Sequence, residues 1–162
     1  MGDDVTAGMP VGRRSRSPGR TIGEGEFGLL TSLTWTNDEL HSNKEYMRTS
    51  QFGERLLGGS VLLALVSGLY CQNPLFRDLL RVHGMKPIAA LGSDARYRGV
   101  FRPGDTLWEE TEVVAVWASQ GQPGRGIITL RDQAFNQNGE LITDGTRAIL
   151  YERGPASGEG RG

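Results

Sequence analysis

The residue with the clearest catalytic potential is His41, which follows the polar run Asn37-Asp38-Glu39. Histidine titrates near neutral pH and a neighbouring carboxylate can orient its ring. A histidine beside acids is therefore the usual arrangement for general acid–base chemistry. We take His41 as the first candidate catalytic residue and Asp38 as its partner. A structural or surface histidine is the alternative interpretation.

A second candidate site is the pair Gly58-Gly59, which precedes Ser60 and the apolar run 61–69. The start of a helix has free N–H groups and the positive end of the helix dipole. Glycine at this place lets a carbonyl group approach the backbone closely, and such a site can hold a developing oxyanion or enolate. The alternative is that the two glycines only let a helix enter a tight space.

One helix and a sheet are predicted to position these residues. The segment 58–71 is apolar nearly all the way round, and a helix without a polar face must be covered on most sides. In a chain of 162 residues, a sheet curled around it is the expected cover. Period-two alternation predicts strands over 88–98, 106–119, 127–137 and 141–153, and Asn138-Gly139 predicts a tight hairpin. Shorter elements are an extended start at 21–22 and helices over 24–33 and 43–49.

These elements predict an α+β fold class with a single hot-dog domain, in which an antiparallel sheet wraps around a central buried helix. We expect the domain over 20–153, with disordered tails at 1–19 and 154–162. A curled sheet leaves one edge exposed. Pairing of two such edges across a two-fold axis covers it, so we expect a homodimer.

Composition excludes several classes of function. The net charge is −1, which gives no electrostatic case for nucleic acid or an anionic membrane surface as a partner. One cysteine and two histidines leave no disulfide and no Cys-rich or multi-His metal centre, and no nucleotide-binding glycine motif is present. The most apolar run is too short to span a membrane, and the N-terminus has no secretory signal, so a cytoplasmic protein without a cofactor is expected.

Two further features have alternative interpretations. Arginines cluster on or beside the first tail, either as a phosphate-binding arm or as a solvated segment. They are Arg13, Arg14, Arg16 and Arg20. Cys71 is expected to be a small buried side chain at the end of the central helix.

Several short segments resemble the MaoC-like dehydratases and (R)-specific enoyl-CoA hydratases. In the first half they are Arg20-Thr21-Ile22, Phe27, Leu33-Thr34, Leu40-His41, Glu45-Tyr46, Phe52-Gly53 and Gly59. In the second half they are Arg102-Pro103-Gly104-Asp105-Thr106-Leu107, Glu112-Val113, Pro123-Gly124-Arg125-Gly126 and Asn136-Gln137-Asn138-Gly139-Glu140. The resemblance covers residues 20–153, and it implies the hot-dog fold.

The resemblance also implies a hydro-lyase of fatty acid metabolism. This family hydrates 2-enoyl thioesters or dehydrates 3-hydroxyacyl thioesters of coenzyme A or acyl carrier protein. His41 falls on the family's catalytic histidine and Gly59 on the glycine whose N–H polarises the thioester carbonyl. Gly58 replaces a histidine that often precedes that glycine. Substrate contacts are expected from Thr36, Gly58, Gly59, Ser60 and Arg125, the last toward the phosphates of coenzyme A.

The sequence departs from the family motif G-D-x-N-P-x-H. Trp35 falls on the Gly, Thr36 on the catalytic Asp, Asp38 on the Asn and Glu39 on the Pro. Threonine is not a carboxylate base, so either Asp38 serves as the partner of His41, the chemistry is altered, or activity is lost. The alternative functions are a hot-dog thioesterase, which needs a carboxylate aimed at the carbonyl carbon, and a non-catalytic subunit that binds acyl thioesters.

Overall fold

The computed structural model describes residues 4–154 as five helices and six strands. The helices are α1 (Glu24–Leu33), α2 (Glu39–Ser42), α3 (Lys44–Arg48), α4 (Gly59–Gln72) and α5 (Pro74–Arg81). The strands are β1 (Arg14–Arg16), β2 (Arg20–Thr21), β3 (Met85–Tyr97), β4 (Thr106–Ala118), β5 (Arg125–Phe135) and β6 (Leu141–Arg153).

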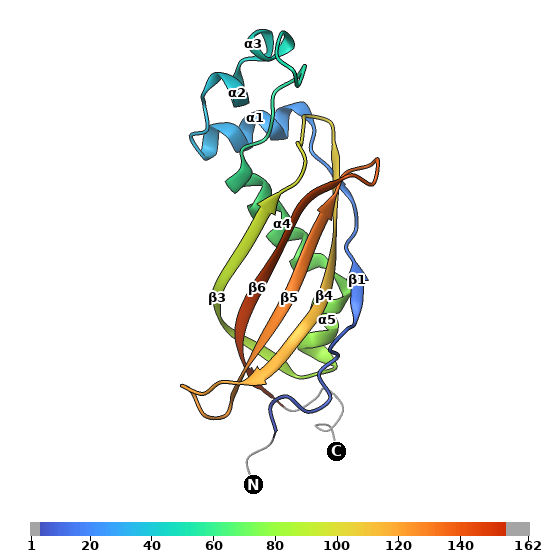
Figure 1. Ribbon diagram of the computed structural model, residues 1–162, viewed down its shortest axis with the longest axis vertical. Helices are drawn as coiled ribbons and strands as arrows, with labels where there is room; N and C mark the ends of the chain where they lie inside the picture. The colour runs from blue at the N-terminus through green and yellow to red at the C-terminus, as the bar shows by residue number, and fades with distance from the viewer. Residues whose placement is uncertain (1–3, 155–162) are drawn as a thin grey trace.

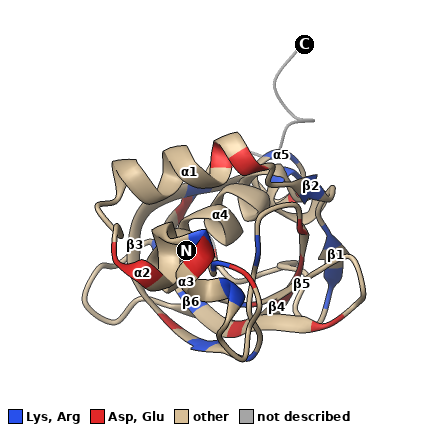
Figure 2. Ribbon diagram, turned by 90° about the horizontal axis from the view of Figure 1, so that it is seen from above, with Lys and Arg blue, Asp and Glu red and all other residues tan. Residues whose placement is uncertain are grey.

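The strands form one antiparallel sheet in the order β1-β4-β5-β6-β3, with β2 also paired to β4. The sheet curls around α4, as the view from above shows (Figure 2). The predicted α+β hot-dog architecture is confirmed. The predicted long strands all form, and β3 begins three residues before the expected start at Ile88.

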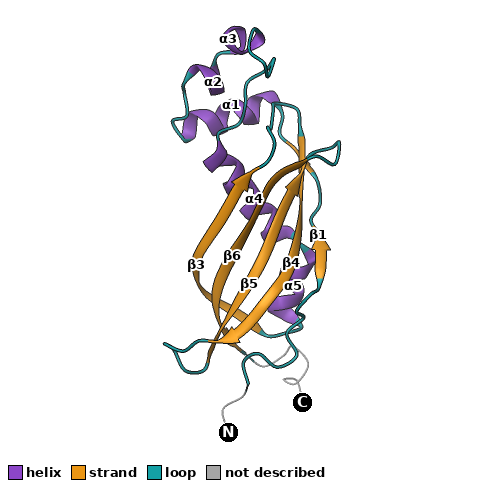
Figure 3. Cartoon of the chain, viewed as in Figure 1, coloured by secondary structure: helices purple, strands orange, loops and turns teal. Residues whose placement is uncertain are grey.

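Three short helices lie beyond one end of the sheet. In Figures 1 and 3, α1, α2 and α3 gather over the first residues of α4, away from the β4–β5 turn at the other end. Phe27 of α1 is fully buried in the same apolar cluster as Val61 and Leu62 of α4. This contact fixes the helical region over the start of α4, where His41 and the glycine pair were expected to act.

The core helix has the predicted limits but not the predicted burial. Its packed face consists of Val61, Leu62, Val66, Leu69 and Tyr70. Its exposed face consists of Ser60, Ala64, Ser67, Gly68, Cys71 and Gln72. The expectation of a helix buried on nearly every side is therefore wrong for the single chain, and so is the expected burial of Cys71. The sheet covers one side of α4 only, and the small side chains of the other side are left open.

The expected N-terminal tail is wrong for residues 4–19. Val5 and Met9 are buried, and the Tyr151 hydroxyl donates to the carbonyl oxygen of Val5 at 2.8 Å. β1 then pairs with β4. Two isolated apolar residues give no periodic signal, so these long-range contacts were not visible in the sequence. Residues 1–3 and 155–162 lie outside the described residues, and with them most of the expected C-terminal tail.

The clustered arginines are engaged on the protein surface. Arg13 pairs with Asp78 at 2.6 Å and Arg14 with Glu112 at 2.8 Å. The guanidinium of Arg16 lies 3.6 Å from the ring centroid of Trp108, and Arg20 pairs with Glu26. Each arginine thus has a partner within the fold, although its side chain stays exposed to solvent.

Helix α5 was missed by the sequence prediction. It begins at Asn73-Pro74, where the Asn73 side chain accepts from the backbone N–H of Leu75 at 3.0 Å. An asparagine cap followed by proline at the first helical position is a normal start signal. Among the described residues, no single helix has the length and apolar character of a membrane span. α4 and α5 have this length and composition only when they are taken together, and the two helices are bent by 54° relative to each other.

Candidate active site at the start of α4

The structure brings His41 to the segment that leads into α4. The ring atom Nδ1 lies 2.6 Å from the carbonyl oxygen of Leu56, two residues before Gly58. The backbone N–H of Leu56 in turn donates to the carbonyl oxygen of Leu40 at 3.2 Å. A carbonyl oxygen only accepts, so Nδ1 carries the proton and Nε2 of the neutral ring has a free lone pair. The histidine side chain is 15% exposed.

Asp38 faces the free nitrogen of His41. It is the N-cap of α2, and its Oδ1 accepts from the backbone N–H of His41 at 3.2 Å. The other carboxylate oxygen, Oδ2, lies 3.9 Å from His41 Nε2. Capping thus holds the carboxylate on the Nε2 side of the ring, at a distance too long for a direct hydrogen bond but short enough for one water to bridge the two atoms.

Thr36 lies against the first glycine of the pair. Its methyl carbon is 3.3 Å from the position that a Cβ on Gly58 would take. Its hydroxyl is 3.0 Å from the hydroxyl of Thr34 and 3.4 Å from the carbonyl oxygen of Thr31. The residue at the motif's carboxylate position therefore contacts the start of α4, but it offers a hydroxyl with local partners and no negative charge.

Trp35 adopts a backbone conformation that favours glycine. Its φ is 58°, and it is the only non-glycine residue with positive φ in the described chain. The N–H groups of Trp35 and Thr36 donate to Ser32 and Thr31 at 3.3 and 3.1 Å, as in the Schellman turn that ends many helices. This left-handed position is where the family motif has its glycine. The Trp35 ring itself is 87% exposed.

Tyr97, which the sequence analysis missed, packs directly on Gly59. A Cβ on Gly59 would lie 2.6 Å from Tyr97 Cζ and 2.8 Å from its hydroxyl oxygen. The space at Gly59 is therefore too tight for a side chain, whichever role its N–H group has. Period-two alternation places Tyr97 on the opposite face of its strand from Arg96 and Arg98, and this was the available signal.

The start of α4 presents unused N–H groups. Gly58 is the N-cap and no side chain caps the helix. Ser60, in the first turn, is exposed. Thr36 and Tyr97 contact the glycine pair, and His41 bonds Leu56 two residues before it, so the acid–base pair and the helix start belong to the same short segment.

Arg125 is not brought to this place within one chain. It begins β5, where it pairs with Glu152 at 2.8 Å. Tyr97 lies opposite Thr143 on β6 and Arg125 lies opposite Glu152. At about 3.3 Å per residue, the two ends are about 30 Å apart. The residue expected to meet coenzyme A phosphates is thus at the far end of the sheet.

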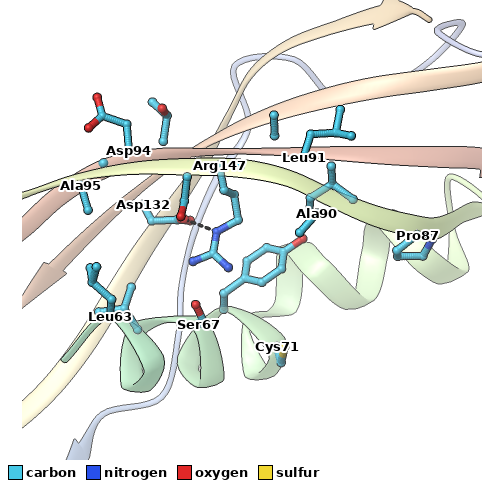
Figure 4. A pocket seen from close by; sticks show the side chains of 18 of the residues that line it. Leu63, Ser67, Cys71, Pro87, Ala90, Leu91, Asp94, Ala95, Asp132 and Arg147 are labelled. Carbon is cyan, nitrogen blue, oxygen red and sulfur yellow. Dashed lines mark hydrogen bonds and ion pairs between the residues drawn. The ribbon is translucent and has the colours of Figure 1, made fainter. Parts of the chain in front are cut away.

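A groove runs along the exposed side of α4, between this helix and β3 (Figure 4). Its volume is about 530 Å³. It starts beside Leu63 and Ala95 and continues past Ser67 to Cys71 and Pro87. The groove therefore begins one helical turn beyond Gly59 and extends away from the candidate site.

A buried polar cluster lies behind the groove. Glu109 is fully buried, accepts from the Thr111 hydroxyl and accepts from Asn73 at 3.3 Å. The pKa of Glu109 is raised to about 8, mainly by burial and also by neighbouring Asp132, against the lowering effect of the Thr111 hydrogen bond. Asp132 pairs with Arg147. Among residues 4–154 no group of three His, Cys, Asp or Glu side chains gathers to hold a metal ion.

No family model matches the sequence, and no curated protein sequence matches it. Solved structures do match. A MaoC-like dehydratase from Rhodospirillum rubrum has a TM-score of 0.75 and 26% identity, covering 91% of this chain and 95% of that chain. An (R)-hydratase from A. caviae involved in PHA biosynthesis has a TM-score of 0.66 and 24% identity, covering 91% and 99%.

A third match is more distant in sequence. The C-terminally truncated HadBC complex from Mycobacterium tuberculosis, a 3R-hydroxyacyl-ACP dehydratase, has a TM-score of 0.68 and 14% identity, covering 93% of this chain and 99% of that chain. The chain has the hot-dog fold of the MaoC-like dehydratases and (R)-hydratases over most of its length. Its structural neighbours are hydratases and dehydratases, which confirms the predicted resemblance.

Proposed function

We propose that this protein is a cytoplasmic hydro-lyase that hydrates 2-enoyl thioesters or dehydrates 3-hydroxyacyl thioesters of coenzyme A or acyl carrier protein. The observation that carries the proposal is the placement of His41. Its Nδ1 is bonded to Leu56 just before the Gly58-Gly59 helix start, and its free Nε2 faces Asp38. This arrangement joins an acid–base group to oxyanion donors.

The proposed chemistry divides between these groups. In hydration, the oxygen of water bonds to C3 of the enoyl group while Nε2 of His41, assisted by Asp38, takes the water's proton. The pair then delivers a proton to C2. The negative charge that develops on the thioester oxygen is stabilised by the N–H groups of Gly59 and Ser60 at the helix start. Dehydration runs through the same steps in reverse.

We further propose that the protein acts as a homodimer joined through β3. This strand is the long edge of the sheet, opposite the short edge strand β1, and Ile88 and Leu91 on it are about half exposed. An exposed apolar edge strand invites pairing with another strand. The small side chains on the open side of α4, such as Ala64 and Gly68, allow a second copy to approach closely. In this arrangement the second copy lies along the open side of α4 and covers the groove.

Thr36 favours a second candidate function, a non-catalytic subunit that binds acyl thioesters. Its hydroxyl is occupied by Thr34 and Thr31, so Asp38 is the carboxylate left to assist His41. That carboxylate is largely exposed and already caps α2. The thioesterase alternative has less support, because it needs a carboxylate directed at the carbonyl carbon rather than at a histidine.

Hydration assays on short, branched and long enoyl-CoA and enoyl carrier-protein thioesters test the proposal. The expected result is turnover by the wild type, with a smaller loss for Asp38→Ala than for removal of His41. Thr36→Asp restores the family's carboxylate. A gain in rate from this change would show that the wild-type site is impaired. A wild type that binds these thioesters without turning any of them over would replace the enzyme proposal with the binding subunit.

A further inference from the structure

The groove beside α4 is mostly apolar, as expected for a site that takes an acyl chain. Its walls are formed by Leu63 and Val66 of α4, Phe76 of α5 and Ile88 and Leu91 of β3. A groove with walls of this kind alone would favour plain alkyl chains.

A polar group interrupts these walls about halfway along. Arg147 of β6 and Asp132 of β5 line the groove and form an ion pair through Arg147 Nε. Figure 4 shows the Arg147 guanidinium pointing from the sheet toward α4, where Ser67 lies. Within residues 4–154 the two terminal nitrogens of Arg147 make no hydrogen bond. They are therefore free donors directed at the space between sheet and helix.

The second free donor is Tyr70. Its side chain lines the groove, is 3% exposed and lies under the Arg147 guanidinium at 4.4 Å from the ring centroid. Its hydroxyl is the only buried side-chain polar atom without a hydrogen-bond partner in the described chain. A buried polar group without a partner costs about 1–3 kcal/mol, so such groups are rare unless something else bonds them.

The charges at this place indicate a neutral ligand group. The positive charge of Arg147 is balanced by Asp132, and the exposed carboxylate of Asp94 lies at the edge of the groove. Glu109 adds no further charge at neutral pH because burial raises its pKa to about 8. A ligand carboxylate or phosphate in the groove would find no positive charge that is not already paired.

We propose that the groove binds the distal part of the acyl group and selects acyl thioesters that carry a neutral oxygen function, a hydroxyl or a ketone, opposite Tyr70 and Arg147. The proposal rests on the proposed function, since it places the thioester at the start of α4. A plain alkyl chain would cover the Tyr70 hydroxyl and the free nitrogens of Arg147 without bonding them. A chain oxygen accepts from both.

Two independent estimates place this oxygen at the same depth. Ser67 lies eight residues after Gly59, which is about 12 Å along a helix at 1.5 Å per residue. Arg147 lies four residues after Thr143, the partner of Tyr97 on β6, which is about 13 Å along a strand. The selected chain therefore extends about 12–13 Å from the thioester oxygen to its own oxygen.

The test compares pairs of acyl-CoA thioesters of equal length, one with a terminal hydroxyl and one with a terminal methyl. Calorimetry measures the dissociation constants of the saturated members, and hydration assays measure kcat/KM of the 2-enoyl members. We expect the wild type to prefer the hydroxylated chain about tenfold at the length that reaches Arg147, the size of one good uncharged hydrogen bond. Shorter pairs should show no preference.

Tyr70→Phe should reduce this preference without lowering stability, because the hydroxyl that it removes has no partner, whereas the free nitrogens of Arg147 remain. Tyr151→Phe is the matched control. Its hydroxyl is also buried but bonds Val5 outside the groove, so it should lose stability and keep the preference. Equal affinity of the wild type for both chain types at every length would overturn the proposal.

Two other results would also bear on it. If Tyr70→Phe weakens the dimer and leaves chain preference unchanged, a second copy fills the groove and the proposal is wrong. If no thioester is hydrated but the hydroxylated saturated chain binds more tightly, the proposed reaction fails and the selective groove stands.

Discussion

The two ends of α4 hold polar groups in opposite ways. At its start, Asp38 is largely exposed, Nε2 of His41 is free and the first N–H groups have no cap. Beyond its end, Glu109 is fully buried, and Asn73, which caps α5, bonds it. At the start of α4, several donors and acceptors have no partner within the protein. Near its other end, almost all of them are bonded within the fold.

This difference indicates that one end of α4 serves the reaction and the other end serves the stability of the fold. Groups that must bond a substrate cannot be saturated beforehand, whereas buried groups that hold strands and helices together must be. The start of α4 is therefore expected to control activity with little effect on folding. The cluster near its other end is expected to control folding. Tyr70 and Arg147 lie between the two, since they belong to the buried cluster yet keep free donors.

His41→Ala should produce the largest effect. Loss of a positioned acid–base group lowers kcat/KM by roughly 10²–10⁴-fold. The unfolding free energy should fall by only about 1–2 kcal/mol, because the carbonyl oxygen of Leu56 loses its bond to the ring. His83→Ala, in the turn before β3, is the control. Steady-state kinetics and urea denaturation measure the two quantities, and equal activity of wild type and His41→Ala would contradict the proposed catalytic role.

Arg147→Met, in contrast to His41→Ala, should lower the unfolding free energy strongly. Removing the arginine leaves the Asp132 carboxylate buried without its partner, and breaking a buried ion pair from one side costs about 3–5 kcal/mol. The double variant Asp132→Asn/Arg147→Met removes the stranded charge and should recover part of this loss. Urea denaturation of the variants tests this. A cost below about 1 kcal/mol would mean that water reaches Asp132 freely.

Glu109→Gln should change how stability depends on pH. Burial raises the pKa of Glu109 in the folded state from its ordinary value of 4.5 to about 8, so the folded chain binds this proton more tightly than the unfolded chain. Its stabilising contribution is complete below pH 4.5 and is lost as pH rises toward 8. The wild type should therefore lose more stability than Glu109→Gln between these pH values. If urea denaturation gives the same change in unfolding free energy for both proteins between pH 4.5 and pH 8, Glu109 does not titrate in this range.

Much of the fold was predictable because its signals are local. The limits of β6 and α1 were predicted to the residue, and α4 was predicted within one residue at each end. Period-two alternation, an apolar run and the Asn138-Gly139 turn each act over a few neighbouring residues. The resemblance to a known family then placed His41 and Gly59 in order along the chain, and the structure brings both to the start of α4.

What could not be predicted depends on contacts between distant segments. The packing of Tyr97 on Gly59 depends on how far β3 extends along α4, and no local pattern encodes that distance. The burial of Val5 depends on a hydrogen bond from Tyr151, 146 residues away. The open face of α4 was missed because an apolar sequence does not show which side the sheet leaves uncovered.

Gly59→Ala and Gly58→Ala sharpen the comparison within the start of α4 itself. A Cβ on Gly59 meets the Tyr97 ring at 2.6 Å, so the ring must leave its place against the proposed oxyanion site. The nearest atom to a Cβ on Gly58 is the Thr36 methyl at 3.3 Å, a much milder contact. We expect Gly59→Ala to lower kcat/KM about tenfold, equivalent to about 1.4 kcal/mol, and Gly58→Ala to lower it much less. Gly59→Ala/Tyr97→Ala removes the clash and should recover activity if the ring is the cause. No recovery would assign the loss to the helix start itself.

Trp35→Gly should produce the smallest change, and in the stabilising direction. A non-glycine residue in the left-handed region costs about 1–2 kcal/mol, and a ring that is 87% exposed gives up little burial when removed. The unfolding free energy should therefore rise by about 1 kcal/mol in Trp35→Gly but not in Trp35→Ala, which keeps the strained backbone. An equal gain in both variants would instead assign the effect to loss of exposed apolar surface. Trp35 directly precedes Thr36, which contacts the start of α4. Measuring the activity and thioester affinity of Trp35→Gly therefore tests whether the strained residue serves the site. If Trp35→Gly is more stable but loses thioester affinity, the ring contacts the substrate, and the chain retains a strained residue at the end that does chemistry.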